Sequence, residues 1–362
     1  MTPPFRADQV GSLLRPPELR EARAKAKRGE ISAEALRNVE DAAIRQAVER
    51  QQAIGLEAIT DGEFRRDWWH VDFLTGLEGV ESYAAPLVVG FHNTEEQPPM
   101  LRVAGKVRRT RPVFVESFRF LNEATQRTAK QTIPAPAMLH MRPGRAGISR
   151  EAYPDLDEFW RDVALAYRAE IRDLAAAGCT YLQLDDTSFA YLCDEKFCAS
   201  MRARGDDPAR LVRTYADAIN EALADRPAGT TVTMHTCRGN FKSTWVAAGG
   251  YEPVVEAFFS AQVDGFFMEF DSERAGDFAP LRFAPKDKKV VLGLVTTKVG
   301  ELEDKDTLKR RIDAAARHVP LENLCLSPQC GFSSTHHGNT LSYEEQWRKL
   351  ERIVEVAREV WR

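Results

Sequence analysis

The chain has 362 residues, a formal net charge of −4, 43% hydrophobic residues and 29% charged residues. Its basic residues are scattered among acidic ones, which excludes the concentrated basic face that nucleic-acid binding needs. No apolar run approaches the roughly 18 residues of a membrane span, and the N-terminus lacks the apolar run of a signal peptide. We therefore expect a cytoplasmic globular protein with neither a nucleic-acid nor a membrane partner. The sequence leaves a homo-oligomer open.

Short apolar or β-branched runs alternate with helical patterns along the chain. The expected strands are Val10, 56–60, 131–134, 180–184, 231–235, 265–269, 290–295 and 323–327. The expected helices are 33–54, 156–177, 208–224, 251–261, 305–318 and 343–360. Gly55 and Gly178 follow the first two helical patterns and are suitable C-cap residues.

Eight such units predict one (β/α)8-barrel domain, a TIM barrel, over residues 1–362. Residues 68–128 interrupt the alternation and contain two alternating runs, 86–91 and 100–108. We interpret this region as an insertion between the second and third strands, made of a β-hairpin and a helix. An open, doubly wound sheet is the alternative architecture.

Polar residues recur directly after the expected strands, where a barrel of this kind places its active site. They are Ser12, Glu63, Asp185, Asp186, His235, Cys237, Glu269, Lys298 and Cys330. The six cysteines of the chain are too sparse for a secreted disulfide scaffold, so each is a core residue, a metal ligand or a nucleophile.

A zinc site is the strongest chemical prediction. His235 and Cys237 are two residues apart, so both point to one face of an extended strand. On its own, this pattern favours a buried core cysteine beside a hydrogen-bonded histidine. Glu269, however, stands in the apolar run 266–270, and a carboxylate there needs a metal or an arginine as partner. Together with Cys330, these residues offer the nitrogen, thiolate and carboxylate ligands that zinc accepts.

The same residues belong to a series of short motifs in a familiar order. The motifs are Val-Gly-Ser at 10–12, Asp-Gly-Glu at 61–63, Gln-Leu-Asp-Asp at 183–186, His-Thr-Cys at 235–237, Glu269 and Pro-Gln-Cys-Gly at 328–331. In this order, over nearly the whole chain, the sequence resembles the catalytic half of cobalamin-independent methionine synthase, in its short stand-alone form.

The resemblance implies a function for each matched position. His235, Cys237, Glu269 and Cys330 match the zinc ligands. Ser12, Glu63 and Asp185 match residues that hold the amino-acid part of homocysteine, and two carboxylates suit its ammonium group. The implied reaction is zinc-dependent transfer of a methyl group from a methyl donor to the thiol of homocysteine, giving methionine. Zinc ionises a bound thiol that is mostly protonated at neutral pH.

The sequence departs from the family where a histidine after the seventh strand is thought to assist protonation of the leaving nitrogen. Lys298 stands there, and an unperturbed lysine is a poor acid at pH 7. We therefore consider Lys298, His336 and His337 as proton donors. A histidine pair on a loop is more often solvated than catalytic.

Three other functions compete with this hypothesis. Alkyl or epoxyalkane transfer to coenzyme M would need arginines for a sulfonate in place of Glu63 and Asp185. A lyase similar to uroporphyrinogen decarboxylase would bind a polycarboxylate with arginines and leave His235, Cys237 and Cys330 without a role. A non-enzymatic paralogue would bind zinc and a thiol without turnover.

Overall fold

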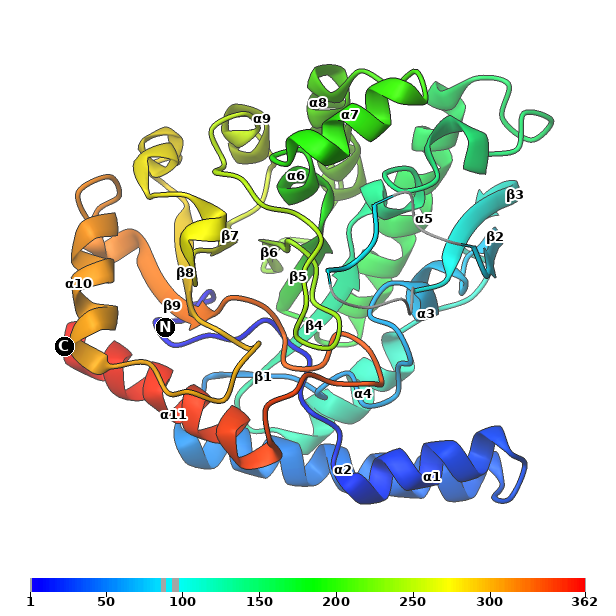
Figure 1. Ribbon diagram of the computed structural model, residues 1–362. Coiled ribbons are helices and arrows are strands. Elements are labelled where there is room, and N and C mark those ends of the chain that lie inside the picture. Colours follow the sequence, from blue (N-terminus) through cyan, green and yellow to red (C-terminus); the bar gives the residue numbers. More distant parts are fainter. Residues whose placement is uncertain (1, 86–88, 93–97, 362) are drawn as a thin grey trace.

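The computed structural model describes residues 2–85, 89–92 and 98–361. A seven-stranded parallel sheet forms its centre, with the strand order β1-β4-β5-β6-β7-β8-β9, and helices surround it (Figure 1). The strands are β1 (Ala58–Ile59), β4 (Thr128–Pro134), β5 (Tyr181–Asp186), β6 (Thr231–Thr236), β7 (Gly265–Glu269), β8 (Lys289–Val295) and β9 (Leu324–Pro328). Seven of the eight expected strands are therefore confirmed, with shifts of a few residues at their ends.

The first expected strand is wrong, because Val10 lies in an extended segment without regular strand structure. Ala7 forms a single parallel bridge with Leu326 of β9, and the backbone N–H of Leu13 donates to Gly62 after β1. The segment thus lies between the two ends of the sheet. The Asp8 carboxylate accepts hydrogen bonds from the backbone N–H groups of Phe5 and Gln9, which competes with strand pairing.

Helices cover the outside of the sheet, as their apolar faces require. They are α1 (Pro17–Lys27), α2 (Ala33–Ile54), α3 (Val71–Leu74), α4 (Val115–Ala124), α5 (Leu156–Ala176), α6 (Ser188–Tyr191), α7 (Glu195–Ala203), α8 (Pro208–Leu223), α9 (Val255–Phe259), α10 (Lys305–Ala315) and α11 (Tyr343–Val360). Short 3-10 turns are η1 (Pro136–Leu139), η2 (Gly144–Gly147), η3 (Glu273–Ala275), η4 (Ala279–Phe283) and η5 (Leu321–Asn323). All six expected helices are present, and α1 was not expected.

Local signals explain where the helices begin and end. The Ser32 hydroxyl accepts from the N–H of Ala35 at the start of α2, and Gly55 ends this helix in the left-handed region with φ 99°. Ser342 and Glu345 form a capping box at the start of α11. Helix α9 is shorter than expected because Pro253 interrupts the helical pattern near its start.

The insertion between β1 and β4 contains the expected hairpin, but with a different first strand. β2 (Glu78–Tyr83) pairs antiparallel with β3 (Met100–Arg108), and α3 and α4 flank the pair. Of the expected run 86–91, residues 86–88 lie outside the described part of the chain, and 89–91 are not in a strand. The true strand was missed because it is polar and mostly exposed, with only Val80 buried.

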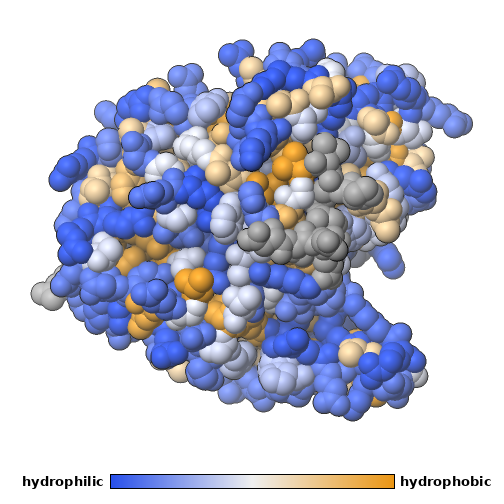
Figure 2. Space-filling view, viewed as in Figure 1, coloured by the Kyte–Doolittle hydropathy of each residue, from blue (hydrophilic) through white to orange (hydrophobic). Residues whose placement is uncertain are grey.

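The core lies between the sheet and the helices, and the strands β5, β7 and β9 are buried along their whole length. This is typical of parallel sheets covered on both faces. Hydrophilic side chains cover most of the face shown in Figure 2, and hydrophobic ones appear between them toward its middle. No described helix combines the length and the apolar character that crossing a membrane would require.

Candidate metal and substrate site

The candidate metal site is built at the carboxyl ends of three strands. His235 is in β6, Glu269 is the last residue of β7, and Cys330 follows β9 by two residues. Parallel strands end at the same edge of the sheet, so residues more than thirty positions apart in sequence meet there. All three side chains are buried. The backbone N–H of Cys237 donates to the carbonyl of Asp186 at the end of β5, so the hydrogen bonding between β5 and β6 continues for one residue.

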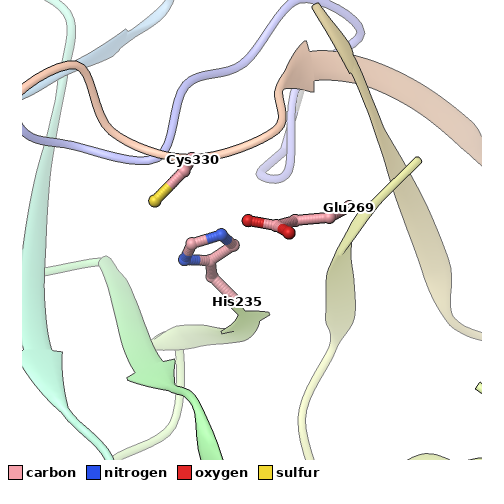
Figure 3. A group of neighbouring side chains, drawn as sticks. All are labelled: His235, Glu269 and Cys330. Carbon is pink, nitrogen blue, oxygen red and sulfur yellow. The ribbon is translucent and has the colours of Figure 1, made fainter. Parts of the chain in front are cut away.

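Ligand atoms of His235, Glu269 and Cys330 all lie within 4.8 Å of one another. Figure 3 shows the three side chains pointing toward a common space. The fourth predicted ligand, Cys237, is adjacent, with its Sγ 3.4 Å from Sγ of Cys330. The structure therefore brings all four predicted residues into one cluster. Cys237 joins the other three by its contact with Cys330.

The polar atoms of Glu269 test whether this cluster fits a metal ion. Its side chain is fully buried, and neither carboxylate oxygen has a hydrogen-bond partner among the described residues. Nε of Arg238 lies 4.0 Å from its Oε2. Burial raises the pKa of this carboxyl group, so its ionised form needs a strong partner. One nitrogen, one carboxylate and two sulfur donors form the set that a zinc ion accepts.

The two thiols share their protons unequally. The hydrogen bond from Cys237 lowers the pKa of Cys330 to about 7, and the same contact raises the pKa of Cys237. Burial works against the charged imidazole of His235, but its hydrogen bond to Asp185 and the surrounding negative charges raise its pKa to about 9. Metal ligation requires all of these groups without their protons, so metal binding here would release protons.

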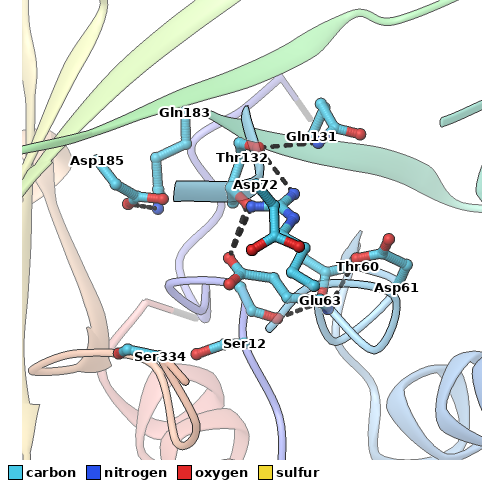
Figure 4. A network of polar contacts seen from close by, with 12 residues as sticks. Ser12, Thr60, Asp61, Glu63, Asp72, Gln131, Thr132, Gln183, Asp185 and Ser334 are labelled. Atoms are coloured by element: carbon cyan, nitrogen blue, oxygen red, sulfur yellow. Dashed lines mark hydrogen bonds and ion pairs between the residues drawn. The ribbon is translucent and has the colours of Figure 1, made fainter. Parts of the chain in front are cut away.

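The predicted substrate residues line one cavity together with three residues of the metal cluster. Ser12, Glu63 and Asp185, which line it, come from three separate segments (Figure 4). The lining residues from the cluster are His235, Cys237 and Cys330. A bound thiol and an ammonium group could therefore be held in this cavity at the same time.

Asp185 has a second contact besides its place in the cavity. Its Oδ1 accepts from Nε2 of Gln183 at 2.7 Å and lies 3.2 Å from Nδ1 of His235. A carboxylate on the second nitrogen of a metal-binding imidazole fixes the orientation of the ring. Gln183 also donates to the carbonyl of Val10, so this network ties the N-terminal segment to the site.

The buried carboxylate of Glu63 is only partly stabilised by its polar contacts. It is 3% exposed and adopts a left-handed backbone conformation, with φ 60°. Its Oε1 accepts from the hydroxyl of Thr132 at 2.8 Å and lies 3.4 Å from Nη1 of Arg66. Burial raises the pKa of Glu63 to about 7, against the lowering effect of Arg66. A cationic substrate group would stabilise its ionised form.

The residues considered as proton donors lie elsewhere. Nζ of Lys298 donates to the carbonyls of Gly239 and Thr244 and to Oδ1 of Asn240, at 3.1 to 3.3 Å. His336 and His337 line a separate cavity beside α1. None of the three residues is among the lining of the substrate cavity.

The cavity contains polar residues that the sequence analysis did not select. They are His70, Arg142, Thr187, Tyr191, Asn240, Ser334 and Thr335. His70 and Arg142 lie in the insertion and in the turn after β4, where no strand-end pattern marks them. The only sequence signal was the unusual run Trp68-Trp69-His70, which places a polar ring next to two large aromatic residues.

Comparisons with known proteins agree with this architecture. The family model described as cobalamin-independent synthase, catalytic domain, matches residues 5–359. The Bacillus subtilis protein YxjH is 49% identical over 99% of this chain and 95% of its own length. A 5-methyltetrahydropteroyltriglutamate–homocysteine methyltransferase from Synechococcus is 25% identical over 99% of this chain, which spans only 43% of that relative.

Two solved structures cover nearly the whole chain. One, from Listeria monocytogenes, was named as a candidate vitamin-B12-independent methionine synthase; it is 43% identical with a TM-score of 0.81, over 100% of this chain and 99% of that one. The other is a B12-independent methionine synthase from Shewanella in complex with selenomethionine. It is 20% identical with a TM-score of 0.75, over 98% and 97% of the chains, and it confirms the TIM-barrel fold.

Proposed function

The chain belongs to the cobalamin-independent synthase family, and from that premise we propose that it is a zinc-dependent S-methyltransferase that methylates the thiol of homocysteine to give methionine. The observation that carries the proposal is the buried cluster of His235, Glu269 and Cys330, which opens, through His235 and Cys330, into the same cavity as Glu63. The names of the Synechococcus and Shewanella relatives support the same reaction.

The cavity residues would hold the amino acid at both of its ends. Glu63 and Asp185 offer carboxylates to the ammonium group, and the Ser12 hydroxyl is available to the carboxylate. Ionisation of a coordinated thiol at neutral pH is the chemistry that a zinc ion supplies when bound by His235, Cys237, Glu269 and Cys330. In the proposed transfer, the homocysteine sulfur would form a bond to the methyl carbon as the bond between that carbon and the donor breaks, and the leaving group of the donor would take up a proton.

The competing reactions fit the cavity less well. A thiol with a sulfonate, such as coenzyme M, would place that anion beside the carboxylates of Glu63 and Asp185. Like charges repel each other in a site that is buried from solvent. A decarboxylase would have no use for two adjacent thiols beside an unpartnered carboxylate.

The first experiment measures zinc in the purified protein. We expect about one zinc ion per wild-type chain and a large loss in Cys330→Ser, because the thiolate is removed from the cluster. Cys198→Ser is the matched control, since Cys198 is in α7 and its Sγ donates to the carbonyl of Leu192. Equal zinc in wild type and Cys330→Ser would contradict the metal site.

The second experiment follows methionine formation from homocysteine with methyl-tetrahydrofolate, its polyglutamate, methylcobalamin and S-methyl donors. We expect product with at least one donor in wild type and none in Cys330→Ser. A zinc-loaded wild-type protein that makes no methionine with any donor would disprove the reaction but not the metal site.

A further inference from the structure

Two buried polar groups in the substrate cavity are not used by the chemistry described above. The imidazole of His70 is 3% exposed, and its Nδ1 has no hydrogen-bond partner among the described residues. The Nη1 atom of Arg142 is buried and equally without a partner in the described part of the chain. Buried polar groups are nearly always hydrogen-bonded in folded proteins, so two residues with such atoms in the lining of one cavity point to a ligand group between them.

The elements around these residues hold them in place. His70 directly precedes α3, and its ring packs against Trp69 with 4.7 Å between ring centroids. Arg142 lies in the turn between η1 and η2, and its Nη2 is 3.4 Å from the hydroxyl of Tyr191 in α6. Both residues line the cavity that contains Glu63 and Cys330.

The lining of the cavity carries charges of both signs. Glu63 and Asp185 provide negative charge for an ammonium group, and Arg142 provides positive charge for the opposite kind of group. Burial, followed by the positive charge of Arg142, holds the pKa of His70 well below its ordinary value. The imidazole is thus neutral at pH 7 and adds hydrogen-bonding capacity, while the guanidinium supplies the charge and donors suited to a carboxylate.

We propose that His70 and Arg142 form an anion-binding subsite that receives a carboxylate of a substrate in this cavity. As a site for a substrate, it rests on the proposed function. In that reaction two substrates can supply the carboxylate, the amino acid and the methyl donor. As an anion site, it stands on the geometry of the two side chains alone.

The first test uses acetate as the probe and needs no turnover. Imidazole ¹H–¹⁵N spectra of the purified protein are recorded during an acetate titration, with the His70 signals assigned by their loss in His70→Gln. We expect acetate to shift the His70 signals in wild type and in Arg142→Lys, which keeps the charge, but not in Arg142→Met. No shift in wild type, or the same shift in Arg142→Met, would overturn the subsite.

The second test distinguishes the two sources by calorimetry on zinc-loaded protein. Homocysteine is compared with 3-aminopropane-1-thiol, which keeps the thiol and ammonium but lacks the carboxylate. If the amino acid supplies the carboxylate, wild type prefers homocysteine by at least about tenfold and Arg142→Met removes the preference. If the methyl donor supplies it, Arg142→Met keeps that preference and binds methyl-tetrahydrofolate about tenfold more weakly.

An Arg142→Met protein that binds both thiols and methyl-tetrahydrofolate like wild type would overturn the substrate role. Failure of wild type to bind either thiol would instead disprove the proposed function, while the acetate titration would still decide whether the anion site exists.

Discussion

At the scale of single residues, Glu63 is a residue that the binding site needs but that lowers the stability of the folded state. Its carboxylate is buried at a left-handed backbone position and has one hydroxyl donor and one guanidinium 3.4 Å away. Ionising such a group is unfavourable until an opposite charge arrives. Strain and burial at one residue therefore support a preference for a cationic substrate group.

We predict a pH dependence of stability that Glu63→Gln removes. The pKa of Glu63 rises from 4.5 to about 7 on folding, so the folded state keeps its proton longer and wild-type stability falls as pH rises through this window. We compare the free energy of unfolding of Glu63→Gln with that of wild type. The difference should favour the variant by about 3 kcal/mol more above pH 7 than at pH 4.

Urea unfolding at pH 4 and pH 8 measures this difference, with the exposed Glu34→Gln in α2 as control. The same Glu63→Gln protein should bind homocysteine more weakly at pH 8, because the ammonium group loses its partner. A stability difference that does not change with pH would contradict the buried-charge explanation.

At the scale of elements, one lysine connects the loops that carry the metal ligands. Lys298, after β8, bonds to three oxygens of the segment 239–244, which follows Cys237. Asn240 of this segment donates to the carbonyl of Gly331, next to Cys330. The lysine thus holds the loop after β6 against the loop after β8, and Asn240 connects the same segment to the loop after β9, beside the two thiols.

We predict that Lys298→Met loosens this loop rather than removing a proton donor. Loss of the buried ammonium removes three hydrogen bonds and leaves the carbonyl of Gly239 without a donor among the described residues, which should lower the free energy of unfolding by about 2–4 kcal/mol. Amide hydrogen exchange of residues 239–246 should become faster, and zinc should dissociate sooner. Lys309→Met, on the outer surface of α10, is the control.

The pH profile of methyl transfer separates the two roles of Lys298. Loosening alone lowers activity without changing the shape of the profile. Loss of the limb at high pH in Lys298→Met, with normal exchange of the loop, would show that the lysine donates the proton after all.

At the scale of the whole molecule, the barrel is closed by an irregular segment instead of an eighth strand. Asp8 holds that segment in place. Its carboxylate lies 3.0 Å from Nζ of Lys130 in β4 and 2.9 Å from the hydroxyl of Tyr181 in β5, and the Asp8 and Lys130 side chains are fully buried. This ion pair joins the N-terminal segment to β4. Both of its residues are far in sequence from the metal cluster.

We predict that Asp8→Ala and Lys130→Met each lower the free energy of unfolding by about 3–5 kcal/mol, because each leaves one buried charge unpaired. The double variant should lose much less than the sum, since neither charge remains. Urea unfolding of the four proteins measures the coupling, with the surface pair of Glu81 and Arg102 as a reference for an exposed interaction. Additive losses would show that the two side chains do not depend on each other.

Much of the site could be predicted from the sequence because its signals are local. Each ligand type follows a strand of alternating or continuous apolar residues, and parallel strands must end at one edge. The positions of His235, Glu269 and Cys330 follow from that rule. The zinc ion itself, the methyl donor, the cytoplasmic location and the oligomeric state stay predictions.

The sequence by itself determined the elements and the residue types at their ends, since caps and periodicity depend on neighbours within a few positions. Tertiary structure alone decided that Lys298 faces loop carbonyls, that His336 and His337 lie outside the cavity, and that His70 and Arg142 line it. It also decided that an extended segment, with Asp8 bonded across the barrel, replaces the first strand. These outcomes depend on contacts between residues up to hundreds of positions apart, which no local pattern encodes.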